Sequence, residues 1–355
     1  MRVGIAGAGL MGRLLAWQLL RQGHTVELFD ADQRDGDVAA ARVAAAMLAP
    51  YSEAVACERE IFDWGRDAVV RWPQLLAELA TDAGPPVWFR HAGSIVVAHR
   101  ADRATLHHFN AHLRQRAPDA LADVRWLDRS ELQALEPELS GFSEATFLAD
   151  EGTLDNHQLL ARLAEAIEVR GGIWHPQTPV ESVAPGELRL ADRTLTFDLA
   201  IDTRGLGARQ QLPGLRGVRG EVLWVRAPDV QLQRPVRLMH PRYQLYIAPK
   251  SDSVYVIGAT EIESDSMAPI TVRSSLELLS ALYSVHSGFA EAEILHSYAN
   301  CRPAFADNLP RIEVGAGLLR VNGLYRHGYL LGPWALELAL AALRGETTHP
   351  VVRRI

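Results

Sequence analysis

Arg2-Val-Gly-Ile-Ala-Gly-Ala-Gly-Leu-Met-Gly12 decides the fold of this chain, because it joins a short apolar run to a Gly-x-Gly-x-x-Gly motif. Apolar residues then recur at helical spacing from Leu10 to Leu20, Gly23 ends that period, and Thr25-Val-Glu-Leu-Phe29 has the composition of a strand. The order strand, glycine turn, helix, strand is the context in which this motif binds a dinucleotide. A nucleotide-binding βαβ unit is therefore predicted.

Each glycine of the motif has a physical task. Gly7 allows a tight turn, Gly9 leaves room for a pyrophosphate at the helix N-terminus, and Gly12 lets helix and strand pack closely. Asp30 closes the second strand, where its carboxylate can accept both ribose hydroxyls. A 2′-phosphate would be repelled there, so the sequence disfavours NADP.

The composition limits the class of protein. With 355 residues, 48% of them hydrophobic, the chain can bury two sizeable cores. A net charge of -7 without a basic block gives no electrostatic footprint for nucleic acid. The only cysteines are Cys57 and Cys301, so a disulfide framework is excluded and a reducing cytoplasm fits. We expect neither a signal peptide nor a membrane span, because glycines interrupt the N-terminal apolar run and no apolar run is long enough to cross a bilayer.

The region after Asp30 predicts a change from βαβ to antiparallel structure. Small apolar residues at 38–48 predict a buried helix against which a flat ligand could lie. Residues 58–80 predict one long amphipathic helix, and residues 87–90 and 94–98 predict the two strands of a hairpin. We place a domain boundary near Pro85.

Both domains are predicted to be discontinuous in sequence. Asn156 is the expected N-cap of a helix that ends at Gly171, and the chain then returns to the first sheet through Leu199-Ala-Ile-Asp202. The nucleotide-binding domain is placed at 1–85, 150–215 and 300–355, and the second domain at 86–149 and 216–299. The further expected elements are a helix at 103–116, strands at 173–174, 180–183, 188–190 and 195–197, antiparallel strands at 219–226, 236–239, 243–249 and 254–259, a helix at 276–285, a strand at 318–322 and a helix at 332–344.

At this point the chain resembles the glycine oxidase and D-amino acid oxidase family of FAD-dependent oxidoreductases. The likeness runs over nearly the whole length. It implies an α/β fold, with a glutathione-reductase-like FAD-binding Rossmann domain beside a mixed antiparallel-sheet α+β substrate domain. The segments that carry it are GIAGAGLMG at 4–12, AAAML at 44–48, RHAGSIVVA at 90–98, VRGEVLWV at 218–225, YIAPKSDSVYVIGAT at 246–260, CRPAFADNLP at 301–310 and VNGLYRHGYLL at 321–331.

The resemblance implies a set of FAD contacts beside the three glycines. The residues independently support one of them, since Gly328 precedes an apolar helix whose N-terminal amides could face the pyrimidine oxygen of the flavin. FAD is expected to be non-covalent, because Cys301 is about one position out of register with the cysteine to which related sarcosine oxidases attach flavin. The implied contacts are Leu10, Met11, Asp30, Ala31, Ala45, Ala46, Met47, Val180, Leu324, Tyr325, Arg326, His327, Gly328, Tyr329 and Leu330.

The resemblance also implies that Tyr246, Arg302 and Arg326 hold the substrate. A guanidinium at 302 can take a carboxylate through two parallel hydrogen bonds. Tyr246 either contacts that carboxylate or is a core tyrosine of a strand, and Arg326 either reaches the substrate or braces its loop.

The chain departs from the family at two places. Ala40 and Ala41 replace hydroxyl residues of the second nucleotide-contact segment, and Glu261 replaces an apolar residue after Gly-Ala-Thr. If Glu261 points inward, the substrate carries an extra cation or hydroxyl; if it points outward, it is a solvated surface residue. Glycine as the substrate is therefore in doubt.

The expected activity is FAD-dependent oxidation of a small amino acid or amine, with O2 or another electron acceptor. FAD carries the hydride chemistry, so no catalytic acid or base need be found in the sequence. Three alternatives stay open: a flavin dehydrogenase that reduces a quinone, an NAD-dependent hydroxy acid dehydrogenase, and an enzyme of modified tRNA nucleosides, which the acidic charge disfavours. No metal site is expected, because His24, His91, His157 and His327 show no i, i+4 pairing with carboxylates.

Overall fold

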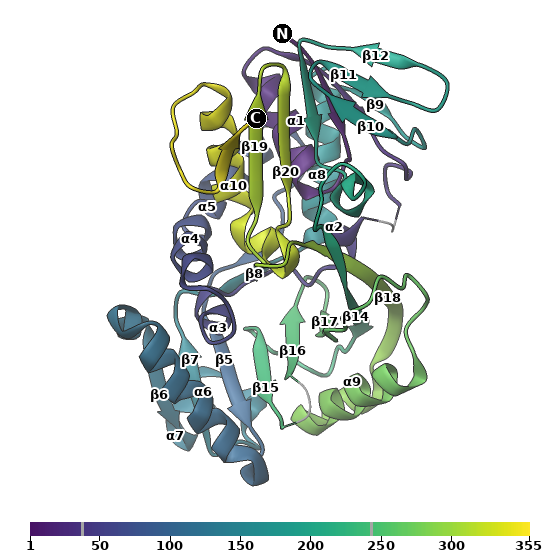
Figure 1. Cartoon of the computed structure of the whole chain (residues 1–355). Coiled ribbons are helices and arrows are strands. Elements are labelled where there is room, and N and C mark those ends of the chain that lie inside the picture. The colour runs from purple at the N-terminus through teal and green to yellow at the C-terminus, as the bar shows by residue number, and fades with distance from the viewer. Residues whose placement is uncertain (37–38, 242–243) are drawn as a thin grey trace.

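The computed structural model describes residues 1–36, 39–241 and 244–355, and it contains two large sheets with the helices packed around them (Figure 1). The seven-stranded sheet has the order β21-β19-β20-β13-β1-β2-β9. The strand β1 pairs in parallel with β2, as the glycine motif predicted, and with β13, which is the central strand of this sheet. The strands are β1 (Arg2–Ala6), β2 (Thr25–Phe29), β9 (Ile173–His175), β13 (Leu199–Asp202), β19 (Arg311–Gly315), β20 (Leu318–Asn322) and β21 (Val352–Arg354).

Three helices cover the seven-stranded sheet and close its core. The helix α1 (Leu10–Arg21) contacts α8 (Asn156–Val169) and α10 (Gly328–Leu343). The strands β1 and β13 are apolar and almost wholly buried, as expected of parallel strands covered on both faces. A three-stranded antiparallel sheet, β10 (Ser182–Ala184), β11 (Glu187–Arg189) and β12 (Thr194–Thr196), lies beside this core.

The eight-stranded sheet has the order β18-β14-β17-β16-β15-β5-β7-β6 and lies in the lower part of Figure 1. It is mostly antiparallel, and only β15 and β5 run in parallel within it. The strand β18 crosses residue 300, so the domain boundary that we propose lies after Ala304 instead. The strands are β5 (Ser94–Ala98), β6 (Val124–Asp128), β7 (Glu144–Leu148), β14 (Arg216–Arg226), β15 (Val236–Met239), β16 (Gln244–Pro249), β17 (Val254–Gly258) and β18 (Glu293–Ala304).

The remaining elements connect the two large sheets or flank them. A small sheet of β3, β8 and β4 lies at their junction. Its strands are β3 (Met47–Leu48), β4 (Phe89–Arg90) and β8 (Gly152–Leu154). The other α-helices are α2 (Ala40–Val43), α3 (Pro50–Ala54), α4 (Arg59–Val69), α5 (Trp72–Asp82), α6 (Arg103–Arg116), α7 (Arg129–Leu135) and α9 (Val272–Val285). The 3-10 helices are η1 (Arg100–Asp102), η2 (Pro118–Asp123), η3 (Pro137–Leu139), η4 (Gly205–Ala208), η5 (Ser287–Glu291) and η6 (Tyr325–His327).

Two predictions about the region 58–98 were wrong. The single long helix is two helices, α4 and α5, because Pro73 lies in the first turn of α5 and cannot donate a backbone hydrogen bond to the preceding turn. The hairpin does not form: β4 pairs with β8, whereas β5 pairs with β7 and β15. The buried carboxylate of Glu151 helps to separate β4 from β5. It accepts a hydrogen bond from the hydroxyl of Ser94 and thereby holds the start of β5 next to β8.

The predicted helix at 38–48 was also wrong. Only α2 is helical, Ala46 has a φ of 50°, and Met47 and Leu48 form a strand with β8. The carbonyl of Ala45 accepts from Lys250 instead of from a helical turn. Val38 and Tyr243, at which two expected elements begin, lie outside the described residues.

The N-cap of α8 is Asp155 and not the predicted Asn156. The carboxylate of Asp155 accepts from the backbone amide of Gln158 at 2.9 Å. The amide group of Asn156 instead donates to the carbonyls of Ala41 and Arg42. The predicted N-cap is therefore one residue too late, because Asp155 and Asn156 are adjacent and either residue type can cap a helix.

Lys250 ties the two halves of the molecule together. Its ammonium is buried and donates to the carbonyl of Ala45 at 2.6 Å, the hydroxyl of Thr153 at 2.9 Å and the carbonyl of Leu154 at 2.5 Å. Burial lowers the pKa of Lys250 to about 7, but three acceptors around one ammonium favour its charged form.

We expect Lys250→Met to destabilise the fold. The substitution keeps the volume but leaves two buried carbonyls without this donor, at a cost of about 1–3 kcal/mol for each. Thermal unfolding should therefore begin several degrees lower, whereas Arg100→Met, at an exposed position, should leave it unchanged; an arginine serves as the control because Lys250 is the only lysine of the sequence. An unchanged Tm would show that Lys250 does not stabilise this junction.

No helix within the described ranges is both long enough and apolar enough to cross a membrane.

Candidate functional site

A cavity of about 920 Å³ lies between the two large sheets. Its walls come from the glycine turn after β1, from the segment 40–49, from the loop after β17, from β18 and from the loop between β20 and α10. These segments are far apart in sequence. The fold therefore brings together most of the residues that the sequence singled out.

One end of the cavity has the form of a dinucleotide site. Gly9, Leu10 and Met11 line it at the N-terminus of α1, where a Cβ on Gly9 would meet no protein atom within 4 Å. A Cβ on Gly12, in contrast, would collide with the carbonyl of Gly7, so this glycine serves the packing of α1 on β1. The open space at Gly9 and the free amides of a helix N-terminus fit a pyrophosphate.

The next wall is flat and apolar. It consists of alanines at 40, 41, 44, 45 and 46 followed by Met47. Small side chains there leave room for a planar ring to lie against the backbone. The residues from Leu324 to Leu330 also line the cavity, and α10 begins at Gly328, earlier than the helix that the sequence predicted at 332–344, so its first turn lies at the cavity wall.

Five of the predicted cofactor residues are not among the lining residues of this cavity. Gly7 and Gly12 shape the turn, and Asp30 accepts the backbone amides of Ala8 and, at 2.8 Å, of Asp32. Ala31 lies just after β2, and Val180 lies between β9 and β10. The Asp30 carboxylate thus holds the glycine turn in shape, a role that the sequence argument had not considered.

The other end of the cavity contains Tyr246 and Arg302. Burial raises the pKa of Tyr246, so its phenol stays neutral, and its hydroxyl forms no hydrogen bond with another described residue. The guanidinium of Arg302 reaches only the carbonyls of Arg219 and Thr260, at 3.3 Å. Within the described residues no carboxylate forms an ion pair with Arg302, so it can accept an external one.

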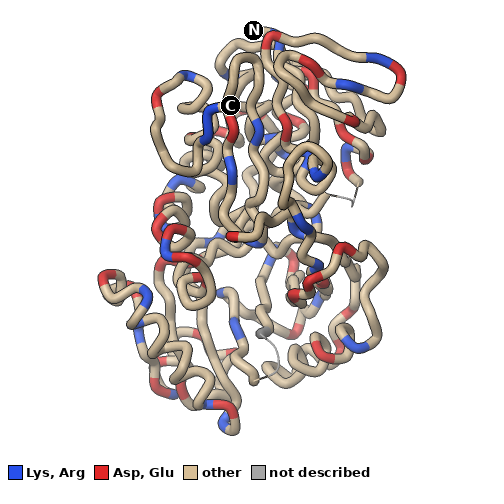
Figure 2. The backbone as a smooth tube through the Cα atoms, in the orientation of Figure 1, with Lys and Arg blue, Asp and Glu red and all other residues tan. Residues whose placement is uncertain are grey.

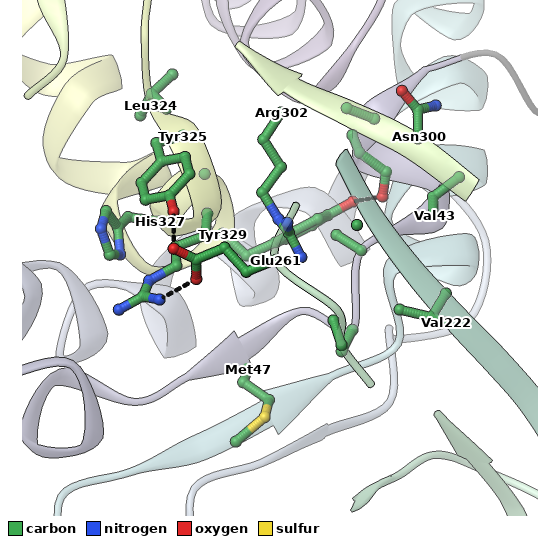
Figure 3. Close-up of a pocket in the computed structure, with 18 of the residues that line it drawn as sticks. Val43, Met47, Val222, Glu261, Asn300, Arg302, Leu324, Tyr325, His327 and Tyr329 are labelled. Atoms are coloured by element: carbon green, nitrogen blue, oxygen red, sulfur yellow. Dashed lines mark hydrogen bonds and ion pairs between the residues drawn. The ribbon is translucent and has the colours of Figure 1, made fainter. Parts of the chain in front are cut away.

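Glu261 lines the cavity, and its carboxylate has two partners there (Figure 3). It accepts from the hydroxyl of Tyr325 and from a terminal nitrogen of Arg326, both at 2.7 Å. Burial would raise the pKa of Glu261, but these two contacts and the charge of Arg302 outweigh it and lower the pKa. Glu261 is therefore an ionised group that binds protein cations.

Arg326 lies between two carboxylates. The Nε of Arg326 forms an ion pair with the carboxylate of Glu53 at 2.7 Å, although its N–H is not directed at the carboxylate oxygen. The terminal nitrogen that does not contact Glu261 donates to the sulfur of Cys57 at 3.3 Å. Its partners therefore fit the second alternative for Arg326, that it braces its loop.

Sequence reasoning missed Glu53 and Arg237, which also line the cavity. The carboxylate of Glu53 is 3.5 Å from Arg237 and 2.7 Å from Arg326. Burial would raise the pKa of Glu53, but the charge of Arg326 above all outweighs it, and the pKa falls to about 2. No local signal marks these residues, because Glu53 and Arg237 are 184 positions apart.

Glu53, Cys57 and His327 place ligand atoms within 4.8 Å of one another, although the sequence predicted no metal site. A search for carboxylates four residues from a histidine does not find this cluster, because His327 approaches Glu53 only in the folded chain, at 3.6 Å. The guanidinium of Arg326 contacts both Glu53 and Cys57, and burial raises the pKa of Cys57 to about 12. This cluster is therefore organised around an arginine, and we assign it no metal.

Known proteins match this chain over almost its full length. The sequence model of the family described as "DAO: FAD dependent oxidoreductase" matches residues 2–341. A putative thiamine biosynthesis oxidoreductase ThiO of Rhizobium etli is 38% identical over 94% of this chain and 93% of its own length. A glycine oxidase of Geobacillus kaustophilus is 26% identical over 93% of this chain and 89% of its own length.

Solved structures agree with the fold. The glycine oxidase of Geobacillus kaustophilus superposes with a TM-score of 0.83 at 24% identity, covering 98% of this chain and 96% of that one. An iminodiacetate oxidase of Chelativorans sp. BNC1 gives a TM-score of 0.83 at 25% identity, covering 99% of both chains. The chain therefore belongs to the DAO family of FAD-dependent oxidoreductases, enzymes that act on amino groups, and FAD is its cofactor.

Proposed function

We propose that this protein oxidises the amine of a small amino acid that is glycine-like, D-configured or N-substituted. Bound FAD would accept at N5 a hydride from the carbon that bears the neutral amine, water would hydrolyse the resulting imine, and the two electrons would pass to O2. The observation that carries this proposal is Arg302, a cavity guanidinium whose partners among the described residues are backbone carbonyls. The names of the relatives, a glycine oxidase and an iminodiacetate oxidase, support the same class of substrate.

In this proposal the protein binds and aligns the substrate. Arg302 takes the carboxylate through two parallel hydrogen bonds, and the neutral phenol of Tyr246 donates a third. A carboxylate fixed in this way holds the reacting C–H at one position relative to a planar ring that lies against the alanine wall. Bound FAD supplies the hydride acceptor, so the chain needs no acid or base at the reacting carbon.

Arg326 and Glu261 support the site in this proposal instead of holding the substrate. Arg326 forms ion pairs with Glu53 and Glu261. Glu261 also accepts a hydrogen bond from the hydroxyl of Tyr325. We therefore do not propose that the substrate carries an additional cation for Glu261.

The test is reduction of the bound flavin without oxygen. The purified holoenzyme is mixed anaerobically with glycine, sarcosine, D-alanine, L-alanine and lactate, and the visible flavin absorbance is followed. Bleaching by one of the first three supports the proposal, and bleaching by lactate alone sinks it. Admitting air then separates the acceptors, because an oxidase regains its colour and forms H2O2 quickly, whereas a dehydrogenase does so only with an added quinone.

Asp30→Ala is expected to weaken FAD binding. The carboxylate holds the amide of Ala8 in the glycine turn, and in this proposal it also accepts the ribose hydroxyls. Hydrogen bonds to a charged group are worth about 1.5–3 kcal/mol, so FAD affinity should fall about tenfold or more. Titration of the apoprotein with FAD measures this. An affinity equal to that of the wild type would remove Asp30 from the site.

A further inference from the structure

The charged groups of the cavity show an excess of one positive charge. Within the described residues, four arginines and three glutamates line it. Burial lowers the pKa of His327 to about 4, so its imidazole is neutral near pH 7. A bound amino acid with a neutral amine has one negative charge, which matches this excess. The lining charges are Arg237, Arg273, Arg302, Arg326, Glu53, Glu261 and Glu277.

The balance of charge depends on where the glutamates lie. Glu53 is near two guanidiniums at once, 2.7 Å from Arg326 and 3.5 Å from Arg237, and its side chain is only 14% exposed. Glu261 approaches Arg326 from the opposite side. Their two carboxylates offset the charges of Arg237 and Arg326. Among the described residues, Arg302 forms no ion pair with a carboxylate, and Arg273 and Glu277 lie exposed on α9.

We propose that Glu53 determines the charge of the substrate that the site accepts, and restricts it to amines that carry a single carboxylate. A second carboxylate would need a second cation, and the nearest ones, Arg237 and Arg326, are already held by Glu53. Glu53 is thus a specificity determinant that acts through the two arginines. This inference rests on the proposed function, since it assumes that Arg302 binds a carboxylate.

The test compares two ligands that differ by one carboxylate. Methoxyacetate and diglycolate have an ether oxygen where sarcosine and iminodiacetate have their nitrogen, so both can enter the site without the amine lone pair that drives hydride loss. Binding is measured as the change that each ligand causes in the visible spectrum of the oxidised holoenzyme. We expect wild type to bind methoxyacetate at least tenfold more tightly than diglycolate.

Glu53→Gln should shift this preference at least tenfold towards diglycolate. The substitution removes one negative charge within a few ångströms of the site, and at an effective dielectric constant of about 20 a charge at that distance changes the affinity for a second carboxylate by more than tenfold. Glu53→Asp keeps the charge and should keep the preference of the wild type. Glu60→Gln, at an exposed position of α4, changes the net charge equally and should shift nothing.

The outcomes separate the inference from the proposed function. If neither ligand perturbs the flavin spectrum of the wild type, the carboxylate site itself is wrong. If methoxyacetate binds but the ratio of the two affinities is the same in wild type and Glu53→Gln, or if wild type prefers diglycolate, the role of Glu53 is wrong. Should Glu53→Gln not retain flavin, Glu261→Gln removes the other carboxylate from Arg326 and must produce the same shift, or the inference falls.

Discussion

Arg302→Ala is expected to abolish binding of carboxylate ligands while the protein keeps its flavin. Arg302 faces the cavity, and its partners are two backbone carbonyls (Figure 3). A carboxylate that enters without it stays buried and lacks its cation, which costs several kcal/mol. Affinity should therefore fall at least a hundredfold. The measurement is anaerobic flavin reduction across a range of amino acid concentrations, together with the spectral titration by methoxyacetate.

Two variants show whether the guanidinium itself is required. Arg302→Lys keeps the charge but not the two parallel donors, so its affinity should lie between those of wild type and Arg302→Ala. Arg226→Ala removes a surface arginine at the far end of β14, where it pairs with Glu293, and should have no effect. Reduction of Arg302→Ala by the same substrates at the same concentrations as wild type would contradict the carboxylate role.

Gly9→Ala should give a folded protein that has lost most of its FAD. A methyl group at position 9 would meet no protein atom within 4 Å, so the apoprotein has space for it. That space is where the pyrophosphate lies at the N-terminus of α1 in this family of cofactor sites. A methyl group in this space would crowd the pyrophosphate, and moving the two apart costs about 1–3 kcal/mol of binding free energy. The affinity for FAD should therefore fall about tenfold or more.

The flavin content of the purified protein and a titration of the apoprotein with FAD check this prediction. Gly141→Ala is the matched control, because a methyl group there also meets nothing within 4 Å and the position is exposed and far from the cavity. Both variants should unfold at the temperature of the wild-type apoprotein. If Gly9→Ala purifies with a full complement of FAD, the pyrophosphate does not pass this glycine.

Local sequence patterns predicted the parts of the fold that local physics determines. The glycine motif and the apolar runs beside it predicted β1, α1 and β2, and the helix at 103–116 was correct to the residue. The region 38–48 failed because its conformation depends on Lys250, which is some 200 positions away and takes the carbonyl of Ala45. No window around residue 45 contains that information.

The candidate site shows the same division. Tyr246, Arg302 and Glu261 all line the cavity; the family motifs singled out the first two, and Glu261 stood out as a departure from the family. The motifs did not show that Arg326 is held by Glu53, because that ion pair joins α3 to η6, elements that meet only in the folded molecule (Figure 1). Acidic and basic residues are spread along the whole described chain (Figure 2), so neither residue stands out by its type.

The contact of Glu261 with Tyr325 and Arg326 has a thermodynamic consequence. Glu261 belongs to the loop after β17 at the substrate end, whereas Tyr325 and Arg326 belong to the loop before α10 that lines the cofactor end. Two ligands whose loops share such a contact are linked, and linkage is reciprocal. If a ligand bound at the substrate end raises the affinity for FAD by some factor, bound FAD must raise the affinity for that ligand by the same factor. Dissociation constants for the cofactor measured with and without methoxyacetate would give that factor directly.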